Sequence, residues 1–239
     1  RSLLGVMAGF LAVCLMRGLN WLRAYMVALP LPLWARPVAA GLAVGILAHF
    51  APGILGPGLD VISAILQGDL SGFDLLVLLG LKAVAAGFCL TLYFHGGIVA
   101  PALFVGAALG GLAAAAFAML TPLTGYAPDS GLFVLAGMAA MGSSVLGAPL
   151  AVILLSFELS QNYAATTAIM VTIVTANLLT SRLYARSVFE PQLLARGVDL
   201  SLGRENLALQ AIKVTQLMAP DFVTLSDKAS VGEAIQHMA

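Results

Sequence analysis

Long apolar stretches follow one another along the chain, and short polar clusters, glycines or prolines separate them. Apolar residues continue over residues 3–21, 73–94 and 164–184, and a helix that begins near Pro101 is predicted to reach Leu120. About 20 apolar residues suffice for a helix to cross a bilayer. Shorter apolar helices are predicted over residues 37–50, 59–67, 130–144, 148–159 and 187–196. The pattern predicts an all-α, multi-pass membrane protein.

The breaks between these segments fall on glycine and proline, chiefly in residues 51–58 and 95–101. Irregular backbone at membrane depth is tolerated only where it is buried in protein or lines a cavity. Transporters use such broken and re-entrant helices to place helix ends at an ion site near the middle of the bilayer. The breaks therefore favour an ion transporter over a simple bundle of spans.

Composition supports a membrane location and excludes one class of partner. Apolar residues make up 61% of the chain and charged residues 9%, whereas a soluble domain carries roughly 25% charged residues. The net charge is zero, and no basic stripe is available to meet the phosphates of a nucleic acid. The lipid bilayer is the expected surrounding.

Cys14 and Cys89 lie far apart in apolar runs and are expected to be small core residues.

Basic residues predict the orientation of the chain. Lys82 is the only lysine or arginine between residues 37 and 181, whereas five follow within residues 182–213. The positive-inside rule places the end of the last span, and the tail after it, in the cytoplasm. Composition becomes soluble near residue 199. Because the chain begins and ends inside patterned segments, we expect it to be a piece of a longer protein.

The strongest candidate site is the segment Gly-Gly-Ile-Val-Ala-Pro at residues 96–101. Glycine lets backbone approach a ligand closely, and proline is tolerated in the first turn of a helix. The N–H groups of Ile98 and Val99 would then lie unpaired at a helix N-terminus, which attracts anions. On spacing alone, a plain loop leading into a membrane helix is the favoured interpretation of the segment.

Residues 96–106 resemble the Gly-Gly-x-Phe-x-Pro-x-x-x-x-Gly signature of the CLC family of chloride channels and proton/chloride antiporters. Residues 147–163, with Ala-Pro-Leu and Phe-Glu-Leu-Ser followed by Asn-Tyr, are similar to a second block of that family. The resemblance extends over most of residues 1–200. It implies the second of two inverted repeats of the CLC fold, chloride as the transported ligand, and a homodimer.

The resemblance also implies which residues hold the anion. The family uses two backbone N–H groups of the signature, a serine hydroxyl and a tyrosine hydroxyl. Here the signature supplies Gly97, Ile98, Val99, Ala100 and Pro101, and the tyrosine position is Phe189, or Tyr184 if the alignment is shifted. Phenylalanine has no hydroxyl, so looser binding or an altered anion preference is expected. The serine and the gating glutamate belong to the other half, which leaves channel and antiporter both open.

We assign residues 1–198 to the membrane domain and 199–212 to a cytoplasmic linker. Residues 213–239 read as a strand, a turn and an amphipathic helix and resemble the beginning of a CBS domain, although a generic α/β segment fits as well. A complete pair of CBS domains could bind an adenine nucleotide. No other cofactor and no metal are expected. The expected dimer contacts come from five apolar residues: Leu150, Ile153, Leu154, Ile169 and Ile173.

Two isolated charges are expected to have structural roles. Lys82 lies in the middle of a span and needs a partner there or a water-filled cavity. Glu158 lies near a helix end, where hydrogen bonds to backbone are expected. A membrane-embedded enzyme would need converging catalytic groups, and a cation transporter with a CBS tail would need acidic residues at its broken helices. The sequence places glycines there, so anion transport without catalysis is preferred.

Overall fold

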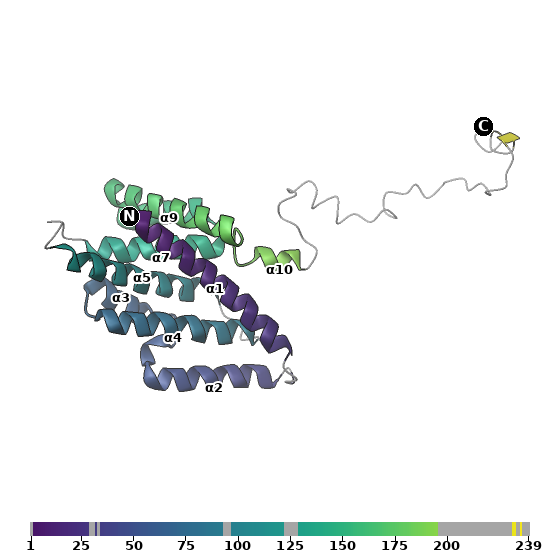
Figure 1. Cartoon of the computed structure of the whole chain (residues 1–239), viewed down its shortest axis with the longest axis horizontal. Helices are drawn as coiled ribbons and strands as arrows, with labels where there is room; N and C mark the ends of the chain where they lie inside the picture. The colour runs from purple at the N-terminus through teal and green to yellow at the C-terminus, as the bar shows by residue number, and fades with distance from the viewer. Residues whose placement is uncertain are drawn as a thin grey trace. The chain divides into compact units, whose positions relative to one another are not determined.

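The computed structural model describes residues 2–28, 32, 34–92, 97–121 and 129–195, together with 231, 232 and 235 (Figure 1). The chain forms two units, Arg1–Gln192 and Leu193–Ala239. The predicted linker and the predicted start of a CBS domain lie outside the described residues, apart from those last three. The following description concerns the first unit.

Nine α-helices and one 3-10 turn make up the regular structure of the described residues, which contain no strand. They are α1 (Ser2–Ala28), α2 (Ala35–Phe50), η1 (Pro52–Ile54), α3 (Leu59–Gln67), α4 (Gly72–Thr91), α5 (Val99–Met119), α7 (Ser130–Leu146), α8 (Pro149–Ser160), α9 (Tyr163–Leu183) and α10 (Glu190–Leu194). Every helix expected from the hydrophobic pattern is present. The prediction of an all-helical fold is therefore confirmed for this part of the chain.

Helix α1 is longer than predicted, since it continues past Trp21 to Ala28. Two polar side chains near the predicted end, Arg17 and Asn20, contact the end of α9 and the residue after it. Arg17 donates from Nη2 to the carbonyl of Leu183 at 2.9 Å, and Asn20 donates from Nδ2 to the hydroxyl of Tyr184. Because Arg17 and Asn20 have these partners, α1 can contain them without ending.

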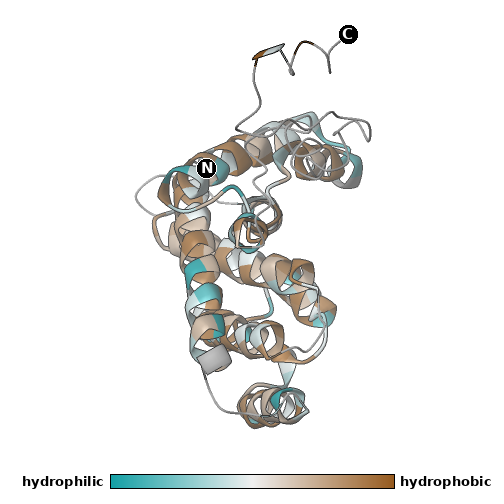
Figure 2. Cartoon of the chain, turned by 90° about the vertical axis from the view of Figure 1, so that its right-hand side faces the viewer, coloured by the Kyte–Doolittle hydropathy of each residue, from teal (hydrophilic) through white to brown (hydrophobic). Residues whose placement is uncertain are grey.

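The helices are suited to an apolar solvent. Four of the described helices are long and apolar enough to cross a membrane: α1, α4, α5 and α9. Figure 2 shows apolar residues over much of the helical part of the chain. Large apolar side chains such as Phe50 and Met119 are 77% and 81% exposed. An exposed apolar surface of this extent indicates contact with lipid or with further protein.

Helices α5 and α7 pack against each other through glycines. A Cβ on Gly106 would lie 2.5 Å from the carbonyl oxygen of Gly137 and 2.8 Å from the Cα of Met138. A Cβ on Gly110 would clash with the carbonyl of Phe133. The two backbones can approach this closely only because these positions have no side chain. Small residues thus determine how closely α5 and α7 pack.

The core of the first unit lies between α1, α5, α7 and α9, which Figure 1 shows side by side with α1 crossing the others. Ile169 and Ile173 belong to this core and are 1% and 0% exposed. The prediction that these two residues face a partner subunit is therefore wrong, because they point into their own bundle. Leu150 and Leu154 are 81% and 59% exposed on α8, while Ile153 packs partly against the core.

Lys82 is buried in the middle of α4 with 3% of its surface exposed. Its ammonium donates to the carbonyls of Ile54 at 2.6 Å and Gly56 at 2.7 Å, and it lies 4.9 Å from the centre of the Phe104 ring. Carbonyl oxygens and an aromatic face together replace the water that the charge has lost. The prediction of a structural partner for Lys82 is confirmed.

Two other expectations about single side chains are wrong. Cys14 is exposed on α1, not in the core, whereas Cys89 is half-buried, and both thiols are free. The side chain of Glu158 is exposed, and its carboxylate makes no hydrogen bond with another described residue. Both positions are on outward helix faces, which the periodicity of these almost uniformly apolar helices could not distinguish from inward ones.

Candidate functional site: a cavity at the start of α5

The first turn of α5 leaves backbone donors unpaired. The helix begins at Val99 after Ile98, and no side-chain hydrogen bond caps this end. The first intrahelical bond runs from the N–H of Ala102 to the carbonyl of Ile98 at 3.1 Å. The N–H groups of Ile98, Val99 and Ala100 therefore precede the hydrogen-bonded ladder, and Pro101 has no N–H to add.

Other long helices begin differently. Ser71 and Asp74 form a capping box at α4, Asp129 caps α7, and Asn162 caps α9. Like α5, helices α2, α3 and α8 lack a side-chain cap. The start of α5 opens on a cavity with a partly polar lining, whereas the cavity at the start of α3 is lined by the carboxylates of Asp60 and Asp74.

This cavity has a volume of about 390 Å³ and lies between α1, α4, α5 and the turn that leads to α10. Its lining includes Gly97, Ile98, Val99 and Phe189, which come from two segments far apart in the sequence. Ala100 and Pro101 belong to the same first turn of α5 but do not line the cavity. The structure therefore brings together four of the six predicted site residues.

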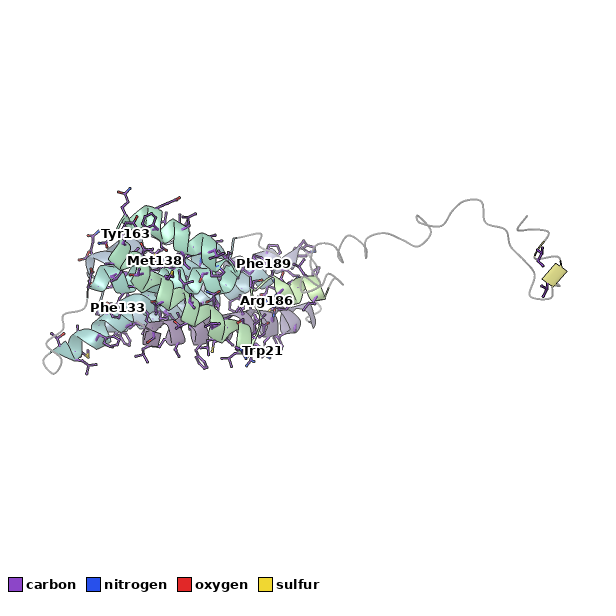
Figure 3. The ribbon with its side chains drawn as sticks, turned by 90° about the horizontal axis from the view of Figure 1, so that it is seen from above. Trp21, Phe133, Met138, Tyr163, Arg186 and Phe189 are labelled. Carbon is purple, nitrogen blue, oxygen red and sulfur yellow. The ribbon has the colours of Figure 1, made fainter. Side chains whose placement is uncertain are left out.

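Phe189 is carried into the cavity by a well-anchored turn between α9 and α10. Val188, beside it, is 3% exposed and donates its N–H to the carbonyl of Val145 on α7 at 2.9 Å. The Glu190 carboxylate accepts the N–H of Arg186 at 2.6 Å. Figure 3 shows Phe189 and Arg186 near the same end of the bundle as Trp21, and Tyr163 near the other end.

Four polar residues that sequence reasoning did not select also line the cavity: Asn20, Arg23, Thr91 and Gln192. Arg23 is exposed and brings the one formal charge among the described residues of the lining. The Thr91 hydroxyl donates to the carbonyl of Gly87 at 2.7 Å, and the Gln192 amide donates to the carbonyl of Val188 at 3.3 Å. The polar cluster at the end of α1 was the available signal, but it was interpreted as a helix end.

Two other sizeable cavities have different linings. One, between α1 and α4, is almost entirely apolar and includes the exposed thiol of Cys14. The other, near η1 and α3, contains the carboxylates of Asp60 and Asp74. An anion is disfavoured beside two carboxylates and gains no hydrogen bond from an apolar wall. Among these cavities, the one at α5 is the best suited to a small anion.

Comparison with known proteins shows which protein family this chain resembles. Residues 2–181 match the family model described as voltage gated chloride channel. The H(+)/Cl(−) exchange transporter ClcA of Salmonella paratyphi A is 33% identical over 151 residues, which cover 63% of this chain and 32% of that protein. Chloride channel protein CLC-f of Arabidopsis thaliana is 33% identical over 174 residues, which cover 67% of this chain and 22% of that protein.

A crystal structure of a slow cyanobacterial Cl−/H+ antiporter has a similar fold, with a TM-score of 0.69 and 24% sequence identity. The similarity covers 88% of this chain and 47% of that one. The chain thus spans less than half the length of each of these relatives. The predicted CLC-type membrane fold is confirmed, and the chain belongs to the voltage-gated chloride channel family.

Proposed function

We propose that the protein containing this chain carries chloride, or another small anion, across a membrane. The observation that supports this most directly is the uncapped N-terminus of α5, which opens on a cavity that also contains a positive charge at Arg23. The family match and the chloride-transporting relatives point in the same direction. The chain would supply part of the anion-binding shell.

The proposed site works through partial charges. An anion at the mouth of α5 meets the N–H groups of Ile98 and Val99 and the positive end of the helix dipole. Val99 is 42% exposed and Phe189 44% exposed, so both contribute apolar walls. Such a site replaces part of the hydration shell without a strong ion pair, which lets an anion leave as well as enter. Arg23 raises the local anion concentration, an effect that salt weakens.

A cation transporter fits the cavity less well. None of the described residues that line it is acidic, whereas cation pathways use carboxylates or converging carbonyl groups. A catalytic role fits less well too, because the described part of the lining contains no nucleophile paired with a base. The relatives are a transporter and a channel by name. We therefore propose a non-catalytic role.

Flux from liposomes tests the proposal. The full-length protein would be reconstituted, and chloride and potassium efflux would be measured with ion-selective electrodes. We expect chloride efflux, with potassium leaving only when an ionophore is added to carry it. Potassium flux without chloride flux would contradict the proposal. Proton movement driven by a chloride gradient would identify an antiporter, and chloride flux without proton movement would identify a channel.

We also propose that the protein is a homodimer in which α8 lies at the contact. Leu150 and Leu154 are exposed on this helix, and an apolar surface within a membrane is well suited to close packing with a second copy. A cysteine at Leu150 should form a dimer crosslink in detergent with a short bifunctional reagent. A cysteine at the exposed Leu42 of α2 serves as the control, and equal crosslinking at both positions would argue against the contact.

We further propose that the end of α9 faces the cytoplasm and that a CBS domain follows. Arg182 and Arg186 follow a long stretch in which Lys82 is the only lysine or arginine, as the positive-inside rule requires of a cytoplasmic end. Protease added to inside-out vesicles should remove the tail after α10. Cleavage in right-side-out vesicles alone would reverse the topology.

A further inference from the structure

We propose that Asn20 is a side-chain ligand of the transported anion, held in place by Tyr184, and that it supplies a donor where Phe189 lacks a hydroxyl. The inference rests on the proposed function and deepens it, because it identifies a part of the binding shell outside the signature segment. It follows from the position of Asn20 in the cavity and from the contacts that fix its amide.

Asn20 shares the cavity with the unpaired start of α5. It comes from α1 and is half-buried, and it lines the same volume as Ile98, Val99 and Phe189. The other neutral polar side chains of the lining already use donors on backbone: the hydroxyl of Thr91 bonds within α4, and the amide of Gln192 bonds to Val188. Among the described neutral polar residues of the lining, Asn20 differs because its side chain bonds to another side chain, the hydroxyl of Tyr184.

The amide of Asn20 retains donor capacity. Its Nδ2 carries two hydrogens, and one of them is donated to the hydroxyl of Tyr184. Within the part of the chain that the structure describes, this is the only hydrogen bond of the Asn20 side chain. The second hydrogen is available to a ligand in the cavity.

Tyr184 is itself held by Arg17, which does not belong to the described lining of the cavity. The guanidinium of Arg17 lies 5.7 Å from the centre of its ring and donates to the carbonyl of Leu183, the preceding residue. Arg17 therefore contacts Tyr184, Tyr184 accepts a hydrogen bond from Asn20, and Asn20 lines the cavity. A donor held in this way loses little freedom when an anion arrives. Tyr184 thus acts as a positioning residue and does not line the cavity itself.

The substitution Asn20→Leu tests the proposal, because leucine has nearly the same size but no donor. Chloride binding to the full-length protein would be measured by titration calorimetry in detergent. A lost hydrogen bond to a charged group predicts a decrease in affinity of about tenfold. Tyr184→Phe should cause a smaller decrease, of about twofold to threefold, because the amide remains but is less well held.

The gain from Phe189→Tyr in two backgrounds distinguishes a ligand from a residue with only a structural role. If the Asn20 amide supplies the donor that Phe189 lacks, adding Phe189→Tyr should raise the chloride affinity of the Asn20→Leu variant by a larger factor than it raises that of the wild type. Ser181→Ala is the control, because its exposed hydroxyl bonds to the carbonyl of Leu178 in its own helix; its affinity should equal that of the wild type. Each variant must keep the thermal midpoint of the wild type.

The outcomes separate the two proposals. If the wild-type protein binds no chloride, the proposed function fails and the inference fails with it. If the wild type binds chloride and Asn20→Leu binds it equally well, the inference alone is overturned. A weaker Asn20→Leu variant in which Phe189→Tyr gains no more affinity than it does in the wild type also overturns it, since the two side chains would then act independently. Weaker binding by Asn20→Leu, with a larger gain from Phe189→Tyr in that background, supports Asn20 as a ligand.

Discussion

Replacing Phe189 with tyrosine should tighten chloride binding about tenfold or more. The ring already lines the cavity at the start of α5 and is 44% exposed, so a hydroxyl at its tip can reach an anion without repacking. A hydrogen bond to a charged group contributes about 1.5–3 kcal/mol, and about 1.4 kcal/mol corresponds to a tenfold change in affinity. Titration calorimetry with the full-length protein measures the change.

Phe10→Tyr provides the matched control. Phe10 lies on α1 with 60% of its surface exposed and does not line the cavity, so the same hydroxyl there should leave affinity unchanged. An unchanged affinity for Phe189→Tyr would mean that the ring edge does not face the bound anion. Position 189 would then have to be withdrawn from the binding shell.

Gly110→Ala is expected to destabilise the protein by about 1–3 kcal/mol, the usual effect of overpacking a close contact. The added methyl group would clash with the carbonyl of Phe133 and lie 2.6 Å from the Cα of Val134. Both are backbone atoms of α7, so no side chain can rotate away and the two helices must separate. A thermal unfolding curve in detergent, followed by the elution profile on gel filtration, measures the loss.

Gly80→Ala is the matched control, since it makes the same chemical change in the interior of α4. No atom lies within 4 Å of the position where its Cβ would be. Alanine is favoured over glycine inside a helix by about 1 kcal/mol, so this variant should be as stable as the wild type or more so. If both variants lowered stability equally, close packing of α5 on α7 could not be the cause.

The hydrophobic pattern alone was sufficient for the helices but not for the directions in which they face. Whether a segment forms a membrane helix depends on its run of apolar residues, and this run is the same however the helices pack together. The inward and outward faces of α9 could not be told apart, because apolar residues lie all round it and lipid accepts them as readily as a core does. For this reason Ile169 and Ile173 were assigned to a subunit contact and are core residues instead.

The candidate site was only partly predictable. Residues 97–99 stand out locally, because glycine and proline at a helix start identify unpaired N–H groups. Phe189 is far from them in sequence, and only the family resemblance connected it to the same site. Asn20 and Arg23 come from α1, where their polarity suggested a helix end. Their place in the cavity depends on how α1 crosses the other helices, which periodicity does not determine.

Lys82 has a consequence for the biosynthesis of the protein. A lone lysine near the centre of a transmembrane helix costs about 2.5–3.5 kcal/mol during insertion at the translocon. The two carbonyls that accept from its ammonium lie 28 and 26 residues away in the chain, at Ile54 and Gly56. Because they precede α4, the ribosome has already made them when Lys82 emerges. The turn after α2 can therefore solvate the charge while α4 enters the bilayer.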